Sequence, residues 1–299
     1  MREFAAEALA DLEIAGAKLA TAKVECPRGG RMDQALEILH AMVKPGNPMR
    51  IHRGDDLGLR AVEFALDYSA IADSLPSPLT LTDRRELRDS LTGGLVPPPE
   101  RLHSLQLQSQ AIVFSAFSRG GLEPTRPSTS AKKPMKSPDL LVGRGTALYG
   151  VEAKRPQRIE NALPRFQDGV EQLKAFGVNG GVLIDLSDCV RQMTPTEIDG
   201  VVESTTWALN DVVFEEGRGH RPGFRHVMIA GCYARLVLPI EADEQTDQVR
   251  LHTSSMIGVF AYAERTLLHH HARWLREGAQ DGLDLLFRTR ADDSFPGAT

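Results

Sequence analysis

The sequence predicts an α/β protein in which a mixed sheet is flanked by helices and preceded by a helical N-terminal region. Between residues 101 and 186 the hydrophobic periodicity changes along the chain in the order helix, strand, strand, strand, helix, strand (αβββαβ). Residues 1–95 instead carry helical periodicity throughout, and the Gly- and Pro-rich stretch 92–99 that follows is typical of a linker. We therefore expect a helical accessory region, residues 1–95, and a second domain, residues 100–299. The second domain would have its core at about 101–186 and further strands and helices in 194–290.

Composition excludes several classes of protein. Hydrophobic residues make up 41% and charged residues 25% of the 299 residues, which is ordinary for a globular protein and enough to bury a sizeable core. The three cysteines form no C-x-x-C pair, which favours a reducing compartment. The N-terminus lacks the apolar segment of a secretory signal, and the longest apolar run, 227–240, is interrupted by Arg235. We expect a cytoplasmic protein with no membrane partner.

The N-terminal region is expected to consist of four helices. Their apolar residues recur at helical spacing and each helix ends at a Gly- or Pro-containing turn. The expected helices are 3–23, 32–43, 57–75 and a short one that begins at Thr80 or Thr82. Nothing in this region indicates chemistry, so we expect it to dock a partner protein or a second copy of the chain.

The core of the second domain is expected to begin with a helix at 101–118 and an irregular strand at 122–128. Pro124 and Pro127 confine that strand to an edge or a bent path, because proline cannot donate to a ladder. Two strands, 140–142 and 147–154, follow and are joined by a glycine-rich turn at 143–145. A helix at 161–176 and a continuous apolar strand at 180–186 complete the pattern.

Two carboxyl groups and an amine converge on the two central strands. Asp139 stands at the start of the first, and the second carries Glu152 and Lys154 two residues apart. Side chains alternate across a strand, so Glu152 and Lys154 share one face. A pair of carboxylates beside an ammonium group can hold a divalent cation and a water molecule, which is the minimum needed to cut a phosphodiester.

The segment around these residues is basic. From Arg119 to Arg165 ten Lys and Arg residues stand against four acids, a net charge of +6 in a chain whose formal charge is −5. Such a stripe suits a polyanionic substrate, although a solvated loop that happens to be basic would have the same composition. The side chains expected to contact backbone phosphates are Lys132, Lys133, Lys136, Arg144, Arg155 and Arg158.

The motif Pro138-Asp139 followed by Glu152-Ala153-Lys154 resembles the signature of the PD-(D/E)xK nuclease superfamily, especially archaeal Holliday-junction resolvases and virus-type repair nucleases. The resemblance covers about residues 101–186. It implies a restriction-endonuclease-like fold in which Asp139, Glu152 and the carbonyl of Ala153 hold Mg²⁺ or Mn²⁺. Lys154 would position the attacking water or stabilise the developing negative charge.

The same resemblance suggests two glutamines as further candidate site residues. Nucleases of this superfamily that act at DNA ends carry a glutamine with an aromatic residue four positions later, and Gln172 with Phe176 is similar to that pair. A surface glutamine and a core phenylalanine would give the same letters. Gln108, on the first core helix, is a weaker candidate for an additional polar group near the metal; an exposed helix residue is the alternative.

The remainder of the chain is expected to extend the fold without adding chemistry. We expect a helix at 196–216, one or two strands within 224–240, an acidic loop at 241–248 and a largely helical segment at 252–286. Consecutive histidines on a helix point about 100° apart, so 269–271 is not expected to bind one metal ion.

These patterns favour a metal-dependent nuclease, most simply one that acts on DNA in phage defence or DNA repair. The alternative is a catalytically inactive module of the same fold that binds nucleic acid or assembles a complex. An enzyme acting on another phosphate ester ranks last, because no glycine loop that would cradle a nucleotide is evident. The form of the nucleic acid, exo or endo action and the oligomeric state stay open.

Overall fold

The computed structural model describes residues 2–45, 56–76, 78–98, 102–127, 137–218, 224–239, 249–260 and 266–287. The chain divides into two compact units, each built from two segments of sequence. Unit 1 comprises Met1–Ile112 and Arg235–His252, and unit 2 comprises Val113–Ala234 and Thr253–Thr299.

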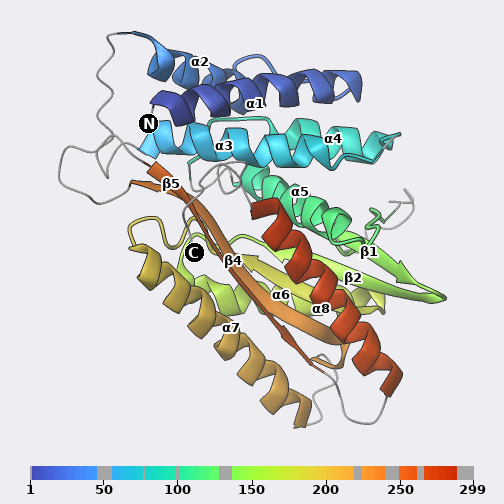
Figure 1. The fold of residues 1–299 in the computed structure, drawn as a ribbon. Coiled ribbons are helices and arrows are strands. Elements are labelled where there is room, and N and C mark those ends of the chain that lie inside the picture. The colour runs from blue at the N-terminus through green and yellow to red at the C-terminus, as the bar shows by residue number, and fades with distance from the viewer. Residues whose placement is uncertain are drawn as a thin grey trace, which may run out of the picture. The chain divides into compact units, whose positions relative to one another are not determined.

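Unit 1 is helical over its N-terminal segment, as the sequence predicts. Its helices are α1 (Arg2–Thr21), α2 (Arg31–Val43), α3 (Asp56–Asp73), α4 (Leu81–Ser90) and the first part of α5 (His103–Arg119). Helices α1, α2 and α3 pack against one another (Figure 1) and bury leucines such as Leu12 and Leu39 completely. Helix α4 begins at a capping box, in which Thr80 and Asp83 satisfy each other's backbone N–H groups.

A buried polar cluster explains why residues from 235 onward belong to unit 1. Arg235, on strand β4 (Val227–Pro239), forms an ion pair with Asp67 of α3. Gln108 of α5 donates to Asp67 Oδ2 at 2.5 Å and accepts from Arg31 Nη2 at 2.6 Å. The backbone N–H of Val237 donates to Glu63 Oε1 at 3.0 Å. The units therefore divide within α5, whereas the composition had placed the boundary at the Gly- and Pro-rich linker.

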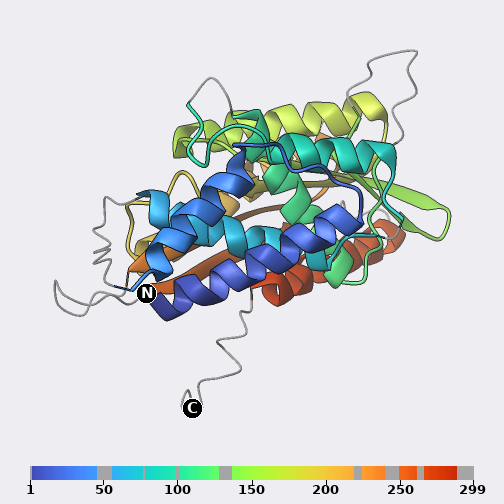
Figure 2. The same ribbon diagram turned by 90° about the horizontal axis from the view of Figure 1, so that it is seen from above.

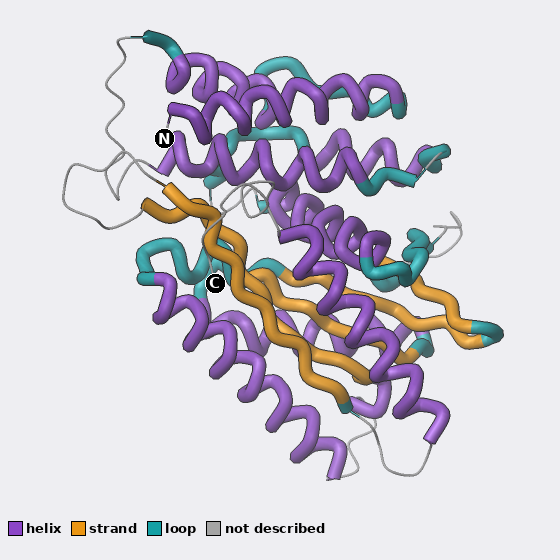
Figure 3. The backbone as a smooth tube through the Cα atoms, viewed as in Figure 1, coloured by secondary structure: helices purple, strands orange, loops and turns teal. Residues whose placement is uncertain are grey.

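A five-stranded sheet organises unit 2. The strands, orange in Figure 3, are β1 (Leu140–Arg144), β2 (Ala147–Lys154), β3 (Asn179–Asp185), β4 and β5 (Val249–Val259). They are hydrogen-bonded to one another in chain order. Strands β1 and β2 are antiparallel, whereas β2 and β3, and β3 and β4, are parallel. The later part of β4 and the first residues of β5 belong to unit 1. The expected α/β class with a mixed sheet is confirmed.

Helices cover both faces of this sheet within unit 2. Helix α6 (Ala162–Phe176) packs on β2 and β3, and α8 (Thr266–Phe287) lies on the opposite side, as the two views in Figures 1 and 2 agree. The side-chain contacts follow the alternation of β2, since Tyr149 reaches His271 of α8 whereas Lys154 reaches Gln172 of α6. Helix α7 (Pro195–Arg218) follows β3 in the chain.

Two local expectations are corrected on the β1 side of the sheet. The strand expected at 122–128 is a single antiparallel bridge between Thr125 and Leu141, because Pro124 and Pro127 on either side have no N–H to donate. The turn between β1 and β2 consists of Gly145 and Thr146, with Gly145 at φ +61° as expected of a turn glycine. Strand β1 continues through Gly143 and Arg144, which were expected to belong to the turn.

The segment expected to be helical at 252–286 contains a strand. Residues 249–259 form β5, and the helix begins at Thr266. The run Thr253-Ser254-Ser255 favours helix poorly, and pairing with β4 settles the choice. The acidic loop expected at 241–248 lies outside the described residues. Over the part of the chain that is described, no helix is both long and apolar enough to span a bilayer.

Candidate functional site

Asp139 and Glu152 are opposite each other across the β1–β2 hairpin. The last pair of the ladder joins Leu140 to Val151, so the next antiparallel pair would join Asp139 to Glu152. Residues directly opposite in an antiparallel pair project from the same face, with Cβ atoms about 5 Å apart. Asp139 is also fixed by its own backbone contact, because its Oδ2 accepts from the N–H of Ala153 at 2.9 Å. The register of the hairpin thus brings the two carboxyl groups together.

Lys154 joins this pair from the same face of β2. Its Nζ donates to Glu152 Oε2 at 2.5 Å and also to Gln172 Oε1 on α6. The Lys154 side chain is only 12% exposed and that of Glu152 is fully buried. The sheet and α6 therefore bring together the four side chains that the sequence singles out, Asp139, Glu152, Lys154 and Gln172.

A glycine sets how closely α6 approaches the carboxylates. A Cβ on Gly169 would lie 2.9 Å from Val182 Cγ1 and 3.3 Å from the Cβ of Glu152. Helix α6 can approach the sheet this closely only because residue 169 has no side chain. Gln172, one turn further along α6, thereby comes within hydrogen-bonding reach of Lys154.

The pKa values of both carboxyl groups are raised, and burial is the largest cause in each case. Burial, followed by the charge of Asp139, raises the pKa of Glu152 from 4.5 to about 8, against the opposing effect of Lys154. Burial likewise raises the pKa of Asp139, while Lys154, the N–H of Ala153 and Arg126 act to lower it. Perturbed carboxyl groups of this kind cluster at functional sites, because the fold alone gains nothing from burying them together.

One buried oxygen at this site has no hydrogen-bond partner. Among the described residues, Glu152 Oε1 accepts no hydrogen bond although the side chain is fully buried. Such an atom is costly unless a ligand or ion completes it. No cluster of three or more His, Cys, Asp or Glu residues suited to a metal occurs in the described part of the chain. A cation at Glu152 would thus depend on two carboxylates, the backbone, water and substrate.

Arg126 is a residue of this site that sequence reasoning counted as part of a basic stripe without assigning it a role. It lies close enough to Asp139 to lower the pKa of that carboxyl group, and its guanidinium lies 5.7 Å from the centre of the Phe114 ring. Its place at the site follows from the neighbouring residue Thr125, which forms a bridge with Leu141 of β1, two residues from Asp139. The bridge could not be predicted from the sequence, because Pro124 and Pro127 disfavour a strand there.

Arg155 is not available for the phosphate contact expected of it. Its side chain is 7% exposed, and it forms ion pairs with Asp185 at 3.3 Å and with Asp188 at 2.7 Å. Burial alone would lower the pKa of Arg155, but the charges of the two aspartates outweigh burial and raise it. This cluster ties the end of β2 to the end of β3, so we assign Arg155 a structural role.

The other basic residues have mixed placements. Arg144 lies 4.8 Å from the centre of the Trp274 ring and donates to the carbonyl of His270 at 3.3 Å, so it is partly engaged by α8. Arg158 is exposed just before the short 3₁₀ helix that leads into α6. Lys132, Lys133 and Lys136 lie outside the described residues.

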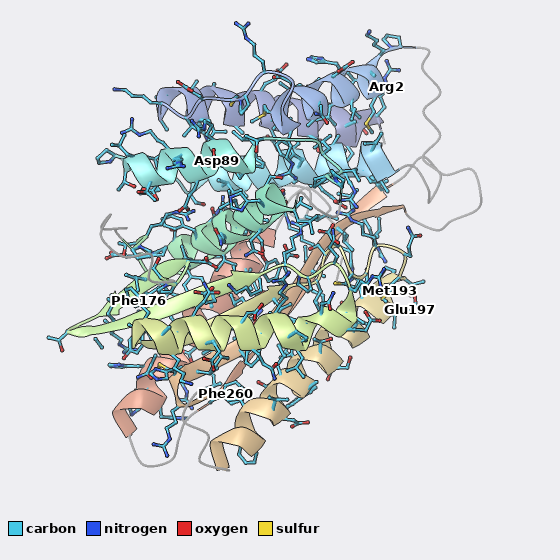
Figure 4. The ribbon with its side chains drawn as sticks, turned by 180° about the vertical axis from the view of Figure 1, so that it is seen from behind. Arg2, Asp89, Phe176, Met193, Glu197 and Phe260 are labelled. Atoms are coloured by element: carbon cyan, nitrogen blue, oxygen red, sulfur yellow. The ribbon has the colours of Figure 1, made fainter. Side chains whose placement is uncertain are left out.

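Phe176 and Gln108, which were the weaker candidates, have different surroundings. Phe176 is half-buried at the C-terminal end of α6, where Figure 4 labels it. Gln108 is buried, and both ends of its amide are engaged by Arg31 and Asp67 of unit 1. The alternative of an exposed Gln108 is therefore wrong, and we do not retain Gln108 as a metal-site residue.

Comparisons with known proteins neither extend nor contradict this picture. No protein-family model matches the chain, and neither a curated protein nor a solved structure matches it.

Proposed function

We propose that this protein is a metal-dependent nuclease of the PD-(D/E)xK type that hydrolyses phosphodiester bonds, most simply those of DNA. The observation that supports this most strongly is the fully buried Glu152 set opposite the half-buried Asp139, with Lys154 between Glu152 and Gln172. A folding protein has little reason to bury one carboxyl group fully beside a second one and to leave an oxygen of the buried group without a partner.

The residues present fit a Mg²⁺ or Mn²⁺ ion. Magnesium prefers one or two carboxylates and completes its shell with waters and substrate phosphates, so Asp139 and Glu152 suffice as side-chain ligands. The N–H and C=O of a strand residue point to the same edge, so the Ala153 carbonyl points to the edge where Asp139 lies. When bound, the ion would polarise the scissile phosphate and lower the pKa of a coordinated water.

Lys154 has the position of a group that acts on the attacking water or on charge that develops at phosphorus. Its Nζ donates hydrogen bonds to Glu152 and to Gln172. With Glu152 as a ligand of the ion, the ammonium group of Lys154 would face the substrate, and Gln172 would keep that group oriented. Gln172 is accordingly proposed to position Lys154. Arg158, which is exposed, and Lys132, Lys133 and Lys136 remain proposed phosphate contacts.

The test is a cleavage assay with labelled duplex, single-stranded and junction DNA and RNA, with Mg²⁺, with Mn²⁺ and with chelator. We expect metal-dependent cleavage of at least one form, and its loss in Asp139→Ala. Asp168→Ala is the matched control, because Asp168 is exposed on α6 and, among the described residues, forms an ion pair only with its near neighbour Arg165. Nucleic-acid binding indifferent to Mg²⁺, without cleavage, would instead support the inactive module.

Gly169→Ala should separate the role of helix position from that of the ligands. In a helix interior, alanine is ordinarily more stabilising than glycine by about 1 kcal/mol. At position 169, however, the alanine methyl group would be too close to Val182 and Glu152. We expect a roughly 10- to 100-fold fall in kcat, because a shift of about 1 Å in Gln172 and Lys154 is costly. Mn²⁺ affinity, measured by calorimetry, should change much less. Unchanged cleavage would show that α6 does not position the site. Gly200→Ala is the control, since a Cβ there meets nothing within 4 Å.

A further inference from the structure

A groove of about 570 Å³ opens on the surface of unit 1. It is lined by the second half of α1, the end of α3, the loop that follows α3 and the start of α4. Its volume lies within the range typical of small-molecule sites. The walls are apolar and include Ile14, Ala17 and Leu79, of which Ile14 is 51% exposed.

The lining of the groove includes three cationic side chains. Lys18, Lys23 and Arg84 all line it. Lys18 is paired with Asp73, but within the described residues no carboxylate forms an ion pair with Lys23 or Arg84. Two positive charges beside an apolar wall are complementary to an anion that carries an apolar body.

Arg84 is held in place with part of its guanidinium unused. Its Nη2 donates to the carbonyl of Leu79 at 3.2 Å, which folds the side chain back over the loop before α4. Its Nε–H is buried and has no hydrogen-bond partner among the described residues. A guanidinium group that lines a groove can donate charge-assisted hydrogen bonds to an anionic oxygen that binds there.

Lys23 occupies a position where glycine is the usual residue. Helix α1 ends in a Schellman turn, in which the N–H of Val24 donates to the carbonyl of Leu19 at 2.9 Å. Lys23 has φ +61°, a left-handed conformation that is unfavourable for a residue with a side chain. A strained residue whose side chain lines a groove indicates that the side chain is used there.

We infer that this groove binds a small amphiphilic anion, with an aliphatic body along Ile14, Ala17 and Leu79 and a carboxylate held by Lys23 and Arg84. The inference does not depend on the proposed nuclease activity. It assigns unit 1 a ligand chemistry of its own.

Calorimetric titration of the full chain with decanoate tests the inference, using concentrations below those at which decanoate forms micelles. We expect saturable one-to-one binding of decanoate and none of acetate or decyltrimethylammonium, which lack the aliphatic body and the negative charge respectively. Binding of decyltrimethylammonium as tight as that of decanoate, or no saturable binding of decanoate, would overturn the assignment.

Lys23→Gly distinguishes a binding role of Lys23 from a purely structural one, because the two roles predict different changes in decanoate affinity. It relieves the left-handed strain and should raise Tm by about 2 °C or more, yet weaken decanoate binding about five- to tenfold. Arg84→Ala should weaken binding to a similar degree, whereas Arg85→Ala, on the same helix but 78% exposed, should not. Ala17→Trp should fill the groove and prevent binding without touching the core. Undiminished affinity in Lys23→Gly, or equal losses in the two arginine variants, would contradict the inference.

Discussion

Replacing Glu152 by Gln is expected to abolish metal-dependent cleavage and, at the same time, to make the protein more stable. The amide keeps the shape of the side chain but removes the negative charge that a cation requires. We expect at least a 10³-fold loss of activity, which corresponds to about 4 kcal/mol of transition-state stabilisation and is within what a metal ion supplies. Cleavage by the purified variant at the rate of the parent would refute the assignment of the site.

The stability change in Glu152→Gln should depend on pH in a defined direction. The pKa of Glu152 in the folded protein, about 8, lies above its ordinary value of 4.5. The contribution of this group to stability is therefore complete below about pH 4.5 and is lost as the pH rises through about 8. Glutamine does not titrate, so the variant should gain little at pH 5 and roughly 1–3 kcal/mol at pH 8.5, after the lost ion pair with Lys154 is counted.

Thermal unfolding at a series of pH values measures this effect. The difference in Tm between Glu152→Gln and the parent should widen steadily from pH 5 to pH 8.5. Glu160→Gln is the matched control, because Glu160 is exposed before α6 and should give a nearly constant difference. A Glu152→Gln difference that shrinks with pH would mean that the carboxylate is stabilised by its surroundings and is not poised for a cation.

The part of the candidate site that lies on the β1–β2 hairpin could be predicted because it is almost entirely local. Asp139, Glu152 and Lys154 lie within sixteen residues of one hairpin, and strand alternation with antiparallel register suffices to place them on one face. Gln172 could be anticipated only through the family resemblance. Its contact with Lys154 depends on the approach of α6 to the sheet, which Gly169 permits and which no periodicity reveals.

What could not be predicted depends on contacts between distant segments. Arg155 was expected to bind phosphate because it is basic and close to the site, but its partners are distant in sequence: Asp185 ends β3 and Asp188 follows that strand. Strand β5 was missed because a short mixed run suits either helix or strand until a neighbouring strand decides. The division into units differs from the expected domain boundary for a related reason, since linker composition carries no information about the pairing of Asp67 with Arg235.

That pairing leads to the largest expected effect on folding. Asp67→Ala would leave the guanidinium of Arg235 buried without its carboxylate partner, and would deprive Gln108 Nε2 of its acceptor. Burial already lowers the pKa of Arg235 to about 10 against the opposing charge of Glu63, so the charge is poorly solvated there. Loss of one partner from a buried pair costs about 3–5 kcal/mol.

Denaturant unfolding measures this cost. Asp73→Ala is the control on the same helix, since its ion pair with Lys18 is exposed and should be worth less than about 1 kcal/mol. A double variant, Asp67→Leu with Arg235→Met, should recover much of the lost stability, because it removes both buried charges together. If Asp67→Ala proved no more harmful than Asp73→Ala, the buried cluster would not hold unit 1 together.

Hydrogen exchange extends the same prediction from stability to organisation. The ion pair joins α3 to β4, and the N–H of Val237 donates to Glu63 one turn away on α3. In Asp67→Ala the amide of Val237 should therefore lose protection together with the amides of α3, whereas residues of β2 should keep theirs. Because Asp139 and Glu152 lie on the β1–β2 hairpin, cleavage should survive at temperatures where the variant remains folded. Loss of protection confined to α3 would show that β4 is held by the sheet alone.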